Sequence, residues 1–431
     1  MSLGSALSIA QTGLSATSRA ADLTSQNVAN ALNEGYARRE LALGTRLTGG
    51  VMVEGITRFA DRAIIADRRI AQAEDGGAAS IADFLRRMED AVGADGSTGS
   101  VGGLVLALDA ALIAASGQPQ SESVLGAAVT AADALASRLN GLTDTVQAAR
   151  LAADKGIAKG VAAINTSLLQ LEKLNGRIVS ATGAEAASLQ DQRQQLVDIV
   201  AAQIPLREIE RDDGRIALMT PDGTMLLDGK AAQLGFAPAN IMADGVEGAG
   251  LTINGRPLDL TSLGNGELAA QFTIRDTLGL DMQKRLDAFA DDLGDRLEGT
   301  GLLQVSGGQY GVDPRLVEEP FRLREGLSAE AETAPGDASR LNAILKSLAA
   351  GAGASGSVAS LVSGISTSRV AAEDRATFAS ARHDALRMAE LSDGVDTDAE
   401  MTKLLSIQQA YTANARVIQA VDKMMQDILG L

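Results

Sequence analysis

One stretch of the sequence has the glycine spacing of a dinucleotide-binding loop. Gly351, Gly353 and Gly356 recur at that spacing, and Glu373 and Asp374 follow. Such a loop binds a pyrophosphate only when it connects a strand to a helix inside a βαβ unit. Here it follows the helical pattern LNAILKSLAA, and no alternating series of strands and helices surrounds it. We therefore interpret the stretch as a flexible linker, and a nucleotide-binding enzyme is kept as an alternative function.

The single histidine, His383, precedes Asp384, and such a pair could act as a general base and acid. Neighbouring residues on a helix point in different directions, so this pair is not expected to act together. Two acidic groups lack the central glycine of a calcium loop: Asp291, Asp292, Asp295 and Glu298, and Asp393, Asp396, Asp398 and Glu400. We interpret them as solvated or helix-capping residues, and we predict no catalytic residue, cofactor or metal site.

The composition excludes several kinds of site. Cysteine is absent, which excludes disulfides, thiolate metal ligands and cysteine nucleophiles. The formal net charge of −17 argues against nucleic-acid binding. The chain is 45% hydrophobic but only 2% aromatic, which suits closely packed helices rather than aromatic-lined ligand pockets. We see neither a cleaved signal peptide nor an apolar run of about 20 residues, and we expect no membrane anchor.

Both ends of the sequence carry apolar residues at the heptad spacing of helices that pack together. In the first 33 residues the two rows are Leu7, Leu14, Ala21 and Val28, and Leu3, Ala10, Thr17, Thr24 and Ala31. The last helix is expected to start at Asp396 and Thr397, with Glu400 at capping-box spacing. Its rows are Leu404, Tyr411, Ile418 and Met425, and Ile407, Asn414, Val421 and Ile428. The first segment has few large apolar residues to offset its backbone entropy, so we expect it to become ordered only on packing.

The middle of the chain is predicted to be helical with a β-rich insertion. Apolar periodicity predicts helices over residues 58–94, 101–116, 121–181, 185–203, 278–299 and 366–392. From residue 206 the period changes to two, and Asp213-Gly214, Asp222-Gly223 and Asn254-Gly255 are typical of hairpin turns. We therefore predict a mainly α fold with coiled-coil-like N- and C-terminal helices packed together. Its parts are a terminal helical assembly domain (1–36 and 396–431), a helical body (37–205 and 276–395) and an inserted β-rich domain (206–275).

Three motifs resemble those of a known family. Asn27-Val-Ala-Asn30 and Gly35-Tyr36-Ala-Arg38 lie near the start, and Gln408-Gln409-Ala-Tyr411-Thr-Ala-Asn414-Ala-Arg416 lies near the end. Together they resemble the shared signatures of the bacterial flagellar axial proteins of the rod, hook and hook-associated group. In the middle, Leu189-Gln-Asp191-Gln-Arg193 resembles a segment of the members that join the hook to the filament. Asn27 and Asn30 are expected to end the first helix, Gly35 to let the chain reverse, and Tyr36 to anchor its exit.

The resemblance implies a structural subunit of the flagellum and not an enzyme. Such a subunit would be secreted unfolded by the flagellar type III export apparatus and would polymerise through its terminal helices at the hook–filament junction. The implied partners are further copies, the hook protein, the second junction protein, an export chaperone and the export apparatus. The residues expected at these contacts are Leu7, Leu14, Asn27, Val28, Asn30, Gly35, Tyr36, Leu404, Ile407, Gln409, Tyr411, Asn414, Arg416, Ile418, Val421, Met425 and Ile428.

Other functions are open at this point. The chain could be another axial protein, such as the hook protein or the second junction protein. The long helices expected over residues 121–203 argue against the hook protein, which should be mostly β after its N-terminal signature. A coiled-coil adaptor that works in the cytoplasm is a further alternative. For the export chaperone, the expected footprint is Ile407, Tyr411, Ile418 and Met425.

Overall fold

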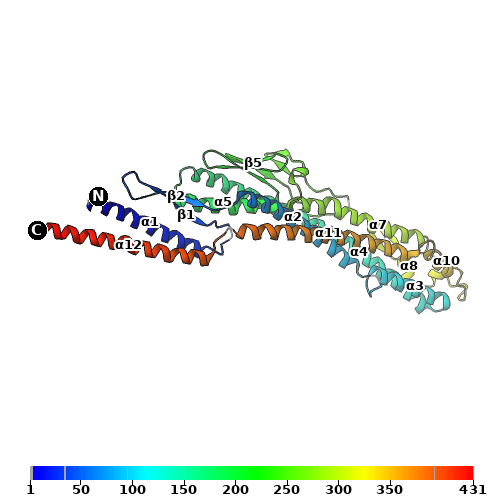
Figure 1. Cartoon of the computed structure of the whole chain (residues 1–431). Coiled ribbons are helices and arrows are strands. Elements are labelled where there is room, and N and C mark those ends of the chain that lie inside the picture. The colour runs from blue at the N-terminus through cyan, green and yellow to red at the C-terminus, as the bar shows by residue number, and fades with distance from the viewer. Residues whose placement is uncertain (1–2, 34, 95, 244, 393, 431) are drawn as a thin grey trace.

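The computed structural model describes residues 3–33, 35–94, 96–243, 245–392 and 394–430. They form an elongated, mainly helical molecule (Figure 1). α1 (Leu3–Ala29) and α12 (Thr397–Leu429) lie side by side at one end, and the other helices extend away from them. The prediction of a mainly α fold in which the two terminal helices pack together is confirmed.

A β-hairpin follows α1. Its strands β1 (Arg39–Thr45) and β2 (Val51–Arg58) pair antiparallel, and the Val51 N–H donates to Thr12 Oγ1 of α1 at 3.2 Å. This part of the predicted helical body is therefore a strand pair, which corrects the prediction. The physical reason lies in the alternating apolar residues of both strands and in the turn residues Gly49 and Gly50. Their φ angles of +85° and +95° favour glycine.

The body is built around α4 (Glu122–Ile178). This helix has 57 residues, which corresponds to about 85 Å at 1.5 Å per residue. The first part of α4 shares one apolar core with α2 (Arg62–Val92), α3 (Val101–Gly117), α7 (Gly279–Arg296), α10 (Ser339–Leu348) and α11 (Gly353–Ser392). The short helices α8 (Pro314–Glu318) and α9 (Arg322–Glu325) contribute to the same core, and the hairpin of β10 (Gln304–Ser306) and β11 (Gln309–Gly311) contacts α4.

The β-rich part packs on the second part of α4 and on α5 (Gly183–Gln203). One sheet has the strand order β3 (Arg207–Glu210), β4 (Ile216–Met219), β5 (Met225–Asp228) and β6 (Lys230–Ala231). The other has the order β7 (Leu234–Gly235), β8 (Thr252–Ile253) and β9 (Arg256–Pro257). The expected Asn254-Gly255 turn is present, with φ angles of +49° and +78°.

Two element boundaries differ from the prediction. After a 3-10 turn at Leu260–Leu263, helix resumes in α6 (Glu267–Thr273) and continues through the π-helical turn Ile274–Leu278 into α7. The end of the range 206–275 is therefore helical and not β. α11 begins at Gly353 and not near residue 366, because Val358, Leu361 and Ile365 are buried in the core at helical spacing.

One helical stretch is long and apolar enough to span a membrane, judged by its length and composition alone. It lies within Ser339–Leu429. Helices that pack inside proteins pass the same test, and α11, which belongs to this range, packs against α2. The expected absence of a membrane anchor stays a prediction.

Candidate assembly site at the joint of the terminal helices

The predicted heptad rows lie on α1 and α12, which pack side by side. Leu7, Leu14 and Val28 of α1 are half-buried. In α12, Val421 is buried, and four further residues of the rows are half-buried: Leu404, Ile407, Asn414 and Ile418. The two helices approach closely at Gly13, where an added Cβ would lie 2.9 Å from Asn414 Nδ2. α1 and α12 therefore form a helix pair within one chain.

Other predicted residues of α12 are open to solvent. Tyr411 is 45% exposed, Met425 39% and Ile428 60%, and Gln409 and Arg416 are exposed as well. The last turns of α12 project past the first described turn of α1 (Figure 1). α1 therefore covers only part of the apolar surface of α12.

Asn27 connects α1 to the β-hairpin. Its side chain is fully buried and donates from Nδ2 to the Arg39 carbonyl at 2.9 Å. Asn27 Oδ1 accepts from the Arg39 N–H at 3.1 Å and from the Tyr36 hydroxyl at 2.8 Å. The amide thus pairs with the backbone of β1 as a neighbouring strand would. Gly35 has a φ of +81°, which lets the chain reverse between the two partners. Asn30, in contrast, donates locally to the Gln26 carbonyl at 2.9 Å.

Asp191 of α5 joins this turn to the body. Its carboxylate pairs with Arg39 and with Arg58 Nε, the latter at 2.7 Å. The Arg39 guanidinium lies 4.8 Å from the centre of the Tyr36 ring. Burial raises the pKa of the Tyr36 phenol against the opposing effect of Arg39, so the hydroxyl keeps its proton as donor to Asn27. Asn27, Tyr36 and Arg39 near the start of the chain therefore meet Asp191 of the central motif, and we call this meeting point the joint.

Glu400 connects the start of α12 to the same joint. The expected capping box is not formed, because Asp396 caps the helix by accepting two backbone N–H bonds at 2.9 and 3.0 Å. Glu400 is 1% exposed, and its Oε1 pairs with Arg38 Nη1 at 3.3 Å. Arg38 also pairs with Glu40 at 2.9 Å, and Lys403 pairs with Glu40 from α12. The hydrogen bond from Lys403 lowers the pKa of Glu40 despite its partial burial.

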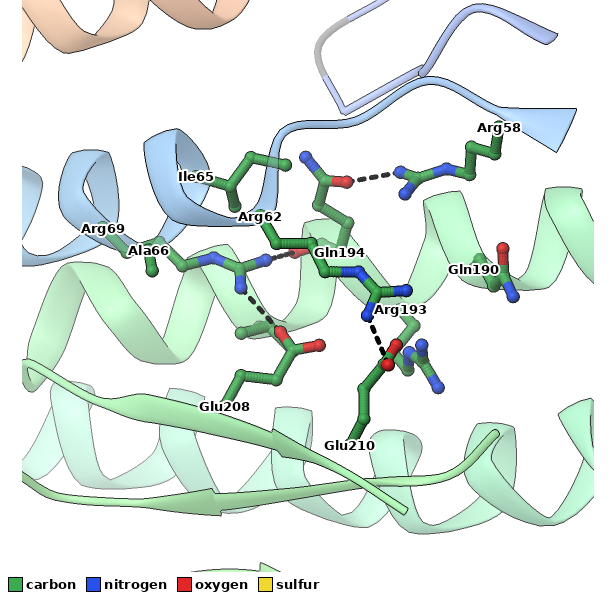
Figure 2. Close-up of a pocket in the computed structure, with 11 residues that line it drawn as sticks. Arg58, Arg62, Ile65, Ala66, Arg69, Gln190, Arg193, Gln194, Glu208 and Glu210 are labelled. Atoms are coloured by element: carbon green, nitrogen blue, oxygen red, sulfur yellow. Dashed lines mark hydrogen bonds and ion pairs between the residues drawn. The ribbon is translucent and has the colours of Figure 1, made fainter. Parts of the chain in front are cut away.

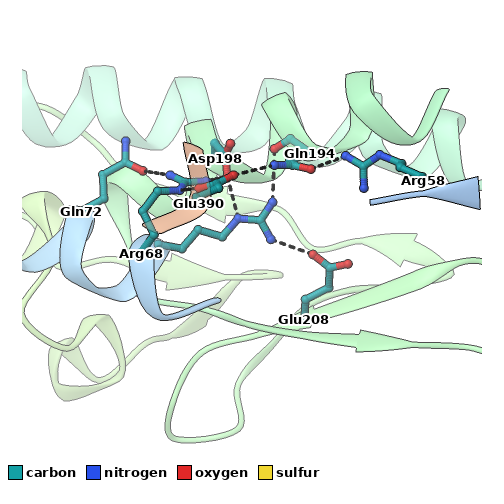
Figure 3. A network of polar contacts seen from close by, with 8 residues as sticks. Arg58, Arg68, Gln72, Gln194, Asp198, Glu208 and Glu390 are labelled. Carbon is teal, nitrogen blue, oxygen red and sulfur yellow. Dashed lines mark hydrogen bonds and ion pairs between the residues drawn. The ribbon is translucent and has the colours of Figure 1, made fainter. Parts of the chain in front are cut away.

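A second set of charges fixes the end of α11 (Figure 3). Arg68 of α2 pairs with Glu390 of α11 and, at 2.9 Å, with Asp198 of α5. Arg69 pairs with Asp198 at 2.6 Å and with Glu208 of β3 at 2.8 Å. Burial disfavours the charged form of Arg68, but the carboxylates of Asp198 and Glu390 outweigh it and raise the pKa. Since α12 follows α11 directly, these ion pairs help to set the direction in which the terminal pair leaves the body.

The residues considered for chemistry have structural partners instead. The glycine stretch 351–356 follows α10 and not a strand, and Gly353 already begins α11, so the prediction of a flexible linker is wrong for most of it. His383 Nδ1 lies 3.1 Å from Asp75 Oδ2 of α2. Asp292 pairs with Arg296 at 2.9 Å. Within the described part of the chain no group of acidic residues and histidine could bind a metal ion, and Asp393 lies outside that part.

Family models match two parts of the chain. The model of the flagellar hook-associated protein FlgK helical domain matches residues 85–300, half of the chain. The model of the flagellar basal body rod FlgEFG protein C-terminal matches residues 392–431, which include α12.

The chain belongs to the FlgK family of flagellar hook-associated proteins.

Members of this family are structural proteins of the bacterial flagellum and not enzymes, and the chain has a structural role in the flagellum. Among solved structures, it is similar to the flagellar hook junction protein FlgK from Burkholderia pseudomallei, with 18% sequence identity and a TM-score of 0.46. That similarity covers 55% of this chain and 43% of the other, so the chain spans less than half of that protein's length. No curated protein matched in the comparison.

Several residues of the joint were missed in the sequence. Arg39, Arg58, Asp198 and Glu390 were not singled out. Arg39 had a signal, since it directly follows the Gly-Tyr-x-Arg motif. The other residues had none, because their partners are remote in the sequence. Arg58 and Asp191 are 133 positions apart, and Arg68 and Glu390 are 322 positions apart.

Proposed function

We propose that this chain is a subunit of the junction between flagellar hook and filament, exported by the flagellar type III apparatus and polymerised through α1 and α12. The family supports the flagellar structural role. The observation that carries the polymerisation is the apolar surface that α1 leaves uncovered on α12. Five of its residues are each 45% to 60% exposed: Leu405, Tyr411, Val417, Met424 and Ile428. Val417, Met424 and Ile428 recur at helical spacing on one side of α12, and an exposed apolar patch of this kind is typical of a protein contact.

The expected contact residues take different roles in this proposal. Leu7, Leu14 and Val28 of α1 and Ile407, Asn414, Ile418 and Val421 of α12 stabilise the helix pair within one chain. The proposal is supported by their partial or full burial. Tyr411, Met425 and Ile428 contact neighbouring copies, the hook protein or the second junction protein. Asn27, Gly35 and Tyr36 fix the angle between the helix pair and the body, so that the open surface is presented in one orientation.

The export chaperone would bind α12 before the helix pair forms. Its proposed footprint consists of Ile407, Tyr411, Ile418 and Met425. Ile407 and Ile418 are half-buried in the described fold, so the footprint is only fully accessible when α12 is separated from α1. This order agrees with export of an unfolded chain, in which release of the chaperone frees α12 to pack.

Val417→Asp tests the assembly surface. Val417 is 45% exposed, so the charge should cost the isolated chain little, whereas it would be buried without a partner in an assembled contact. We expect an unchanged circular dichroism spectrum and melting temperature, together with loss of assembly. The bacteria should shed unpolymerised flagellin while their hooks remain.

Gln419→Asp is the matched control, because Gln419 is an exposed polar residue of the same helix. It should leave motility intact. Full motility of the Val417→Asp strain would contradict the assembly surface. Immunogold labelling of isolated flagella tests the position: label at the distal end of the hook supports the junction, and label along the hook or the filament contradicts it.

A further inference from the structure

A pocket beside the joint contains a buried guanidinium without a carboxylate partner. The pocket has a volume of about 290 Å³ and lies between the start of α2, α5 and β3 (Figure 2). Four arginines line it, together with Glu208 and Glu210: Arg58, Arg62, Arg69 and Arg193. Arg193 belongs to the same Asp-Gln-Arg motif as Asp191. Asp191 forms the ion pairs of the joint, whereas Arg193 does not contribute to the joint.

Three of these arginines are neutralised by carboxylates. Arg58 pairs with Asp191 at 2.7 Å, Arg62 pairs with Glu210, and Arg69 pairs with Asp198 and Glu208. Figure 2 shows the Arg62 and Arg69 pairs on the pocket wall. These three side chains already have the partners that a guanidinium requires when it is taken out of water.

Arg193 differs from them. It is only 7% exposed, and its Nη1 donates to the Gly214 carbonyl at 2.7 Å. Within the described part of the chain it forms no ion pair. Burial lowers the pKa of Arg193, with Arg58 and Arg62 acting in the same direction and Glu208 and Glu210 against it. A buried guanidinium that has no carboxylate partner would be stabilised by an anion bound in the pocket.

Among the arginines that belong to these ion pairs or line the pocket, one has no carboxylate partner. Five arginines are matched by five carboxylates, namely Arg39, Arg58, Arg62, Arg68 and Arg69 by Asp191, Asp198, Glu208, Glu210 and Glu390. Arg193 is the sixth guanidinium. One carboxylate would therefore complete the pairing of the arginines in this set.

We propose that the pocket binds one carboxylate group, supplied by an acidic side chain of a second copy of this chain. The planar fork of Arg193 suits the two oxygens of a carboxylate. Arg62 is 73% exposed at the rim and can turn from Glu210 toward the incoming group. Each copy carries 55 acidic residues and a net charge of −17, so carboxylates are plentiful on the surfaces that meet in a polymer. The identity of the donor rests on the proposed function, whereas the affinity for a carboxylate does not.

Acetate is the probe for the pocket itself. The melting temperature of the full chain is measured in sodium acetate and in sodium chloride at equal ionic strength. We expect a saturable stabilisation by acetate, and Arg193→Gln should weaken the apparent affinity about ten-fold, since a charge-assisted bond is lost. Arg62→Ala, at the exposed rim, should weaken the apparent affinity for acetate less. This variant still tests the pocket if Arg193→Gln does not fold. No acetate effect, or an equal effect in all three proteins, would overturn the site.

Cross-linking identifies the donor. The chain has no cysteine, so Gln190→Cys on the pocket wall provides a single attachment point for a photo-cross-linker. In assembled flagella, a cross-link to an acidic segment of a second copy supports the proposal. A cross-link only to another flagellar protein, or none between chains, overturns the donor. If the chain assembles somewhere other than the junction, the proposed function fails while the acetate result still stands.

Discussion

Replacing Asn27 by alanine should open the joint between α1 and the hairpin, while replacing Asn30 should not. The two asparagines belong to the same short motif and look equivalent in the sequence. In the structure, Asn27 is fully buried and bonds to a residue of another element, whereas Asn30 bonds to its own helix at the surface.

The magnitude follows from the groups that lose their partner. Asn27→Ala leaves the Arg39 N–H and carbonyl without a hydrogen bond in a buried position, and it removes the acceptor of the Tyr36 hydroxyl. An unsatisfied buried polar group costs about 1–3 kcal/mol. The two backbone groups alone therefore give a loss of about 2–6 kcal/mol at the joint. Tyr36→Phe, which removes one bond and leaves the amide pairing, should cost about 1 kcal/mol. Asn30→Ala should stay below about 0.5 kcal/mol.

Hydrogen exchange detects this opening locally. Peptides that cover residues 24–45 should exchange at least about 30-fold faster in Asn27→Ala, because 1.4 kcal/mol corresponds to a factor of ten. Peptides from the core of α4 should be unchanged, and Asn30→Ala should resemble the unaltered chain. Equal exchange in the two asparagine variants would refute the reasoning, since it would mean that the buried amide contributes no more than the exposed one.

Two further predictions concern the body and the β-rich part. Gly77→Ala places a Cβ 2.4 Å from the Asn265 carbonyl oxygen and should lower the free energy of unfolding by about 1–3 kcal/mol in urea titration. Gly76→Ala, whose Cβ meets only an ordinary 3.5 Å contact, should raise it by about 0.5–1 kcal/mol, and an equal effect at both positions would contradict the close packing. Hydrogen bonds from Ser262 and Thr220 lower the pKa of Asp222 from 3.8 to about 2, so its contribution is complete above about pH 4 and is lost as the pH falls through about 2. Asp222→Asn should lower the free energy of unfolding by about 1 kcal/mol near neutral pH, after allowance for solvent exposure. It should also reduce the change in that free energy between about pH 2 and pH 4. An unchanged dependence of stability on pH would contradict this role of Asp222.

The sequence by itself determined the secondary structure wherever the spacing of apolar residues repeated over several turns. The apolar periodicity of α1, α4 and α12 predicted helices, because a stripe of apolar residues at 3.6 residues per turn can be recognised from residues that are close in the sequence. The Asn254-Gly255 turn was also predictable, since the positive φ of both residues is a local preference. The hairpin β1–β2 had the same kind of signal in its alternating residues and in Gly49-Gly50, but it is short and lies between long helices.

The start of α11 was decided by packing. Residues 351–357 consist of Gly, Ala and Ser, which favour a loop when they are considered alone. Burial of Val358, Leu361 and Ile365 in the core makes helix the better conformation from Gly353 onward. Tertiary contacts overrode the local preference here, as they commonly do for small residues of weak propensity.

The candidate site was decided almost entirely by tertiary structure. The sequence indicated that Asn27, Tyr36 and Arg38 matter, and that α1 and α12 pack together. It could not show that Asn27 would pair with the backbone of Arg39, or that Glu400 would form an ion pair with Arg38 and not a capping box. Periodicity describes one helix by itself, whereas the partner of a buried charge depends on which helices lie side by side. That choice is made only when the whole chain packs.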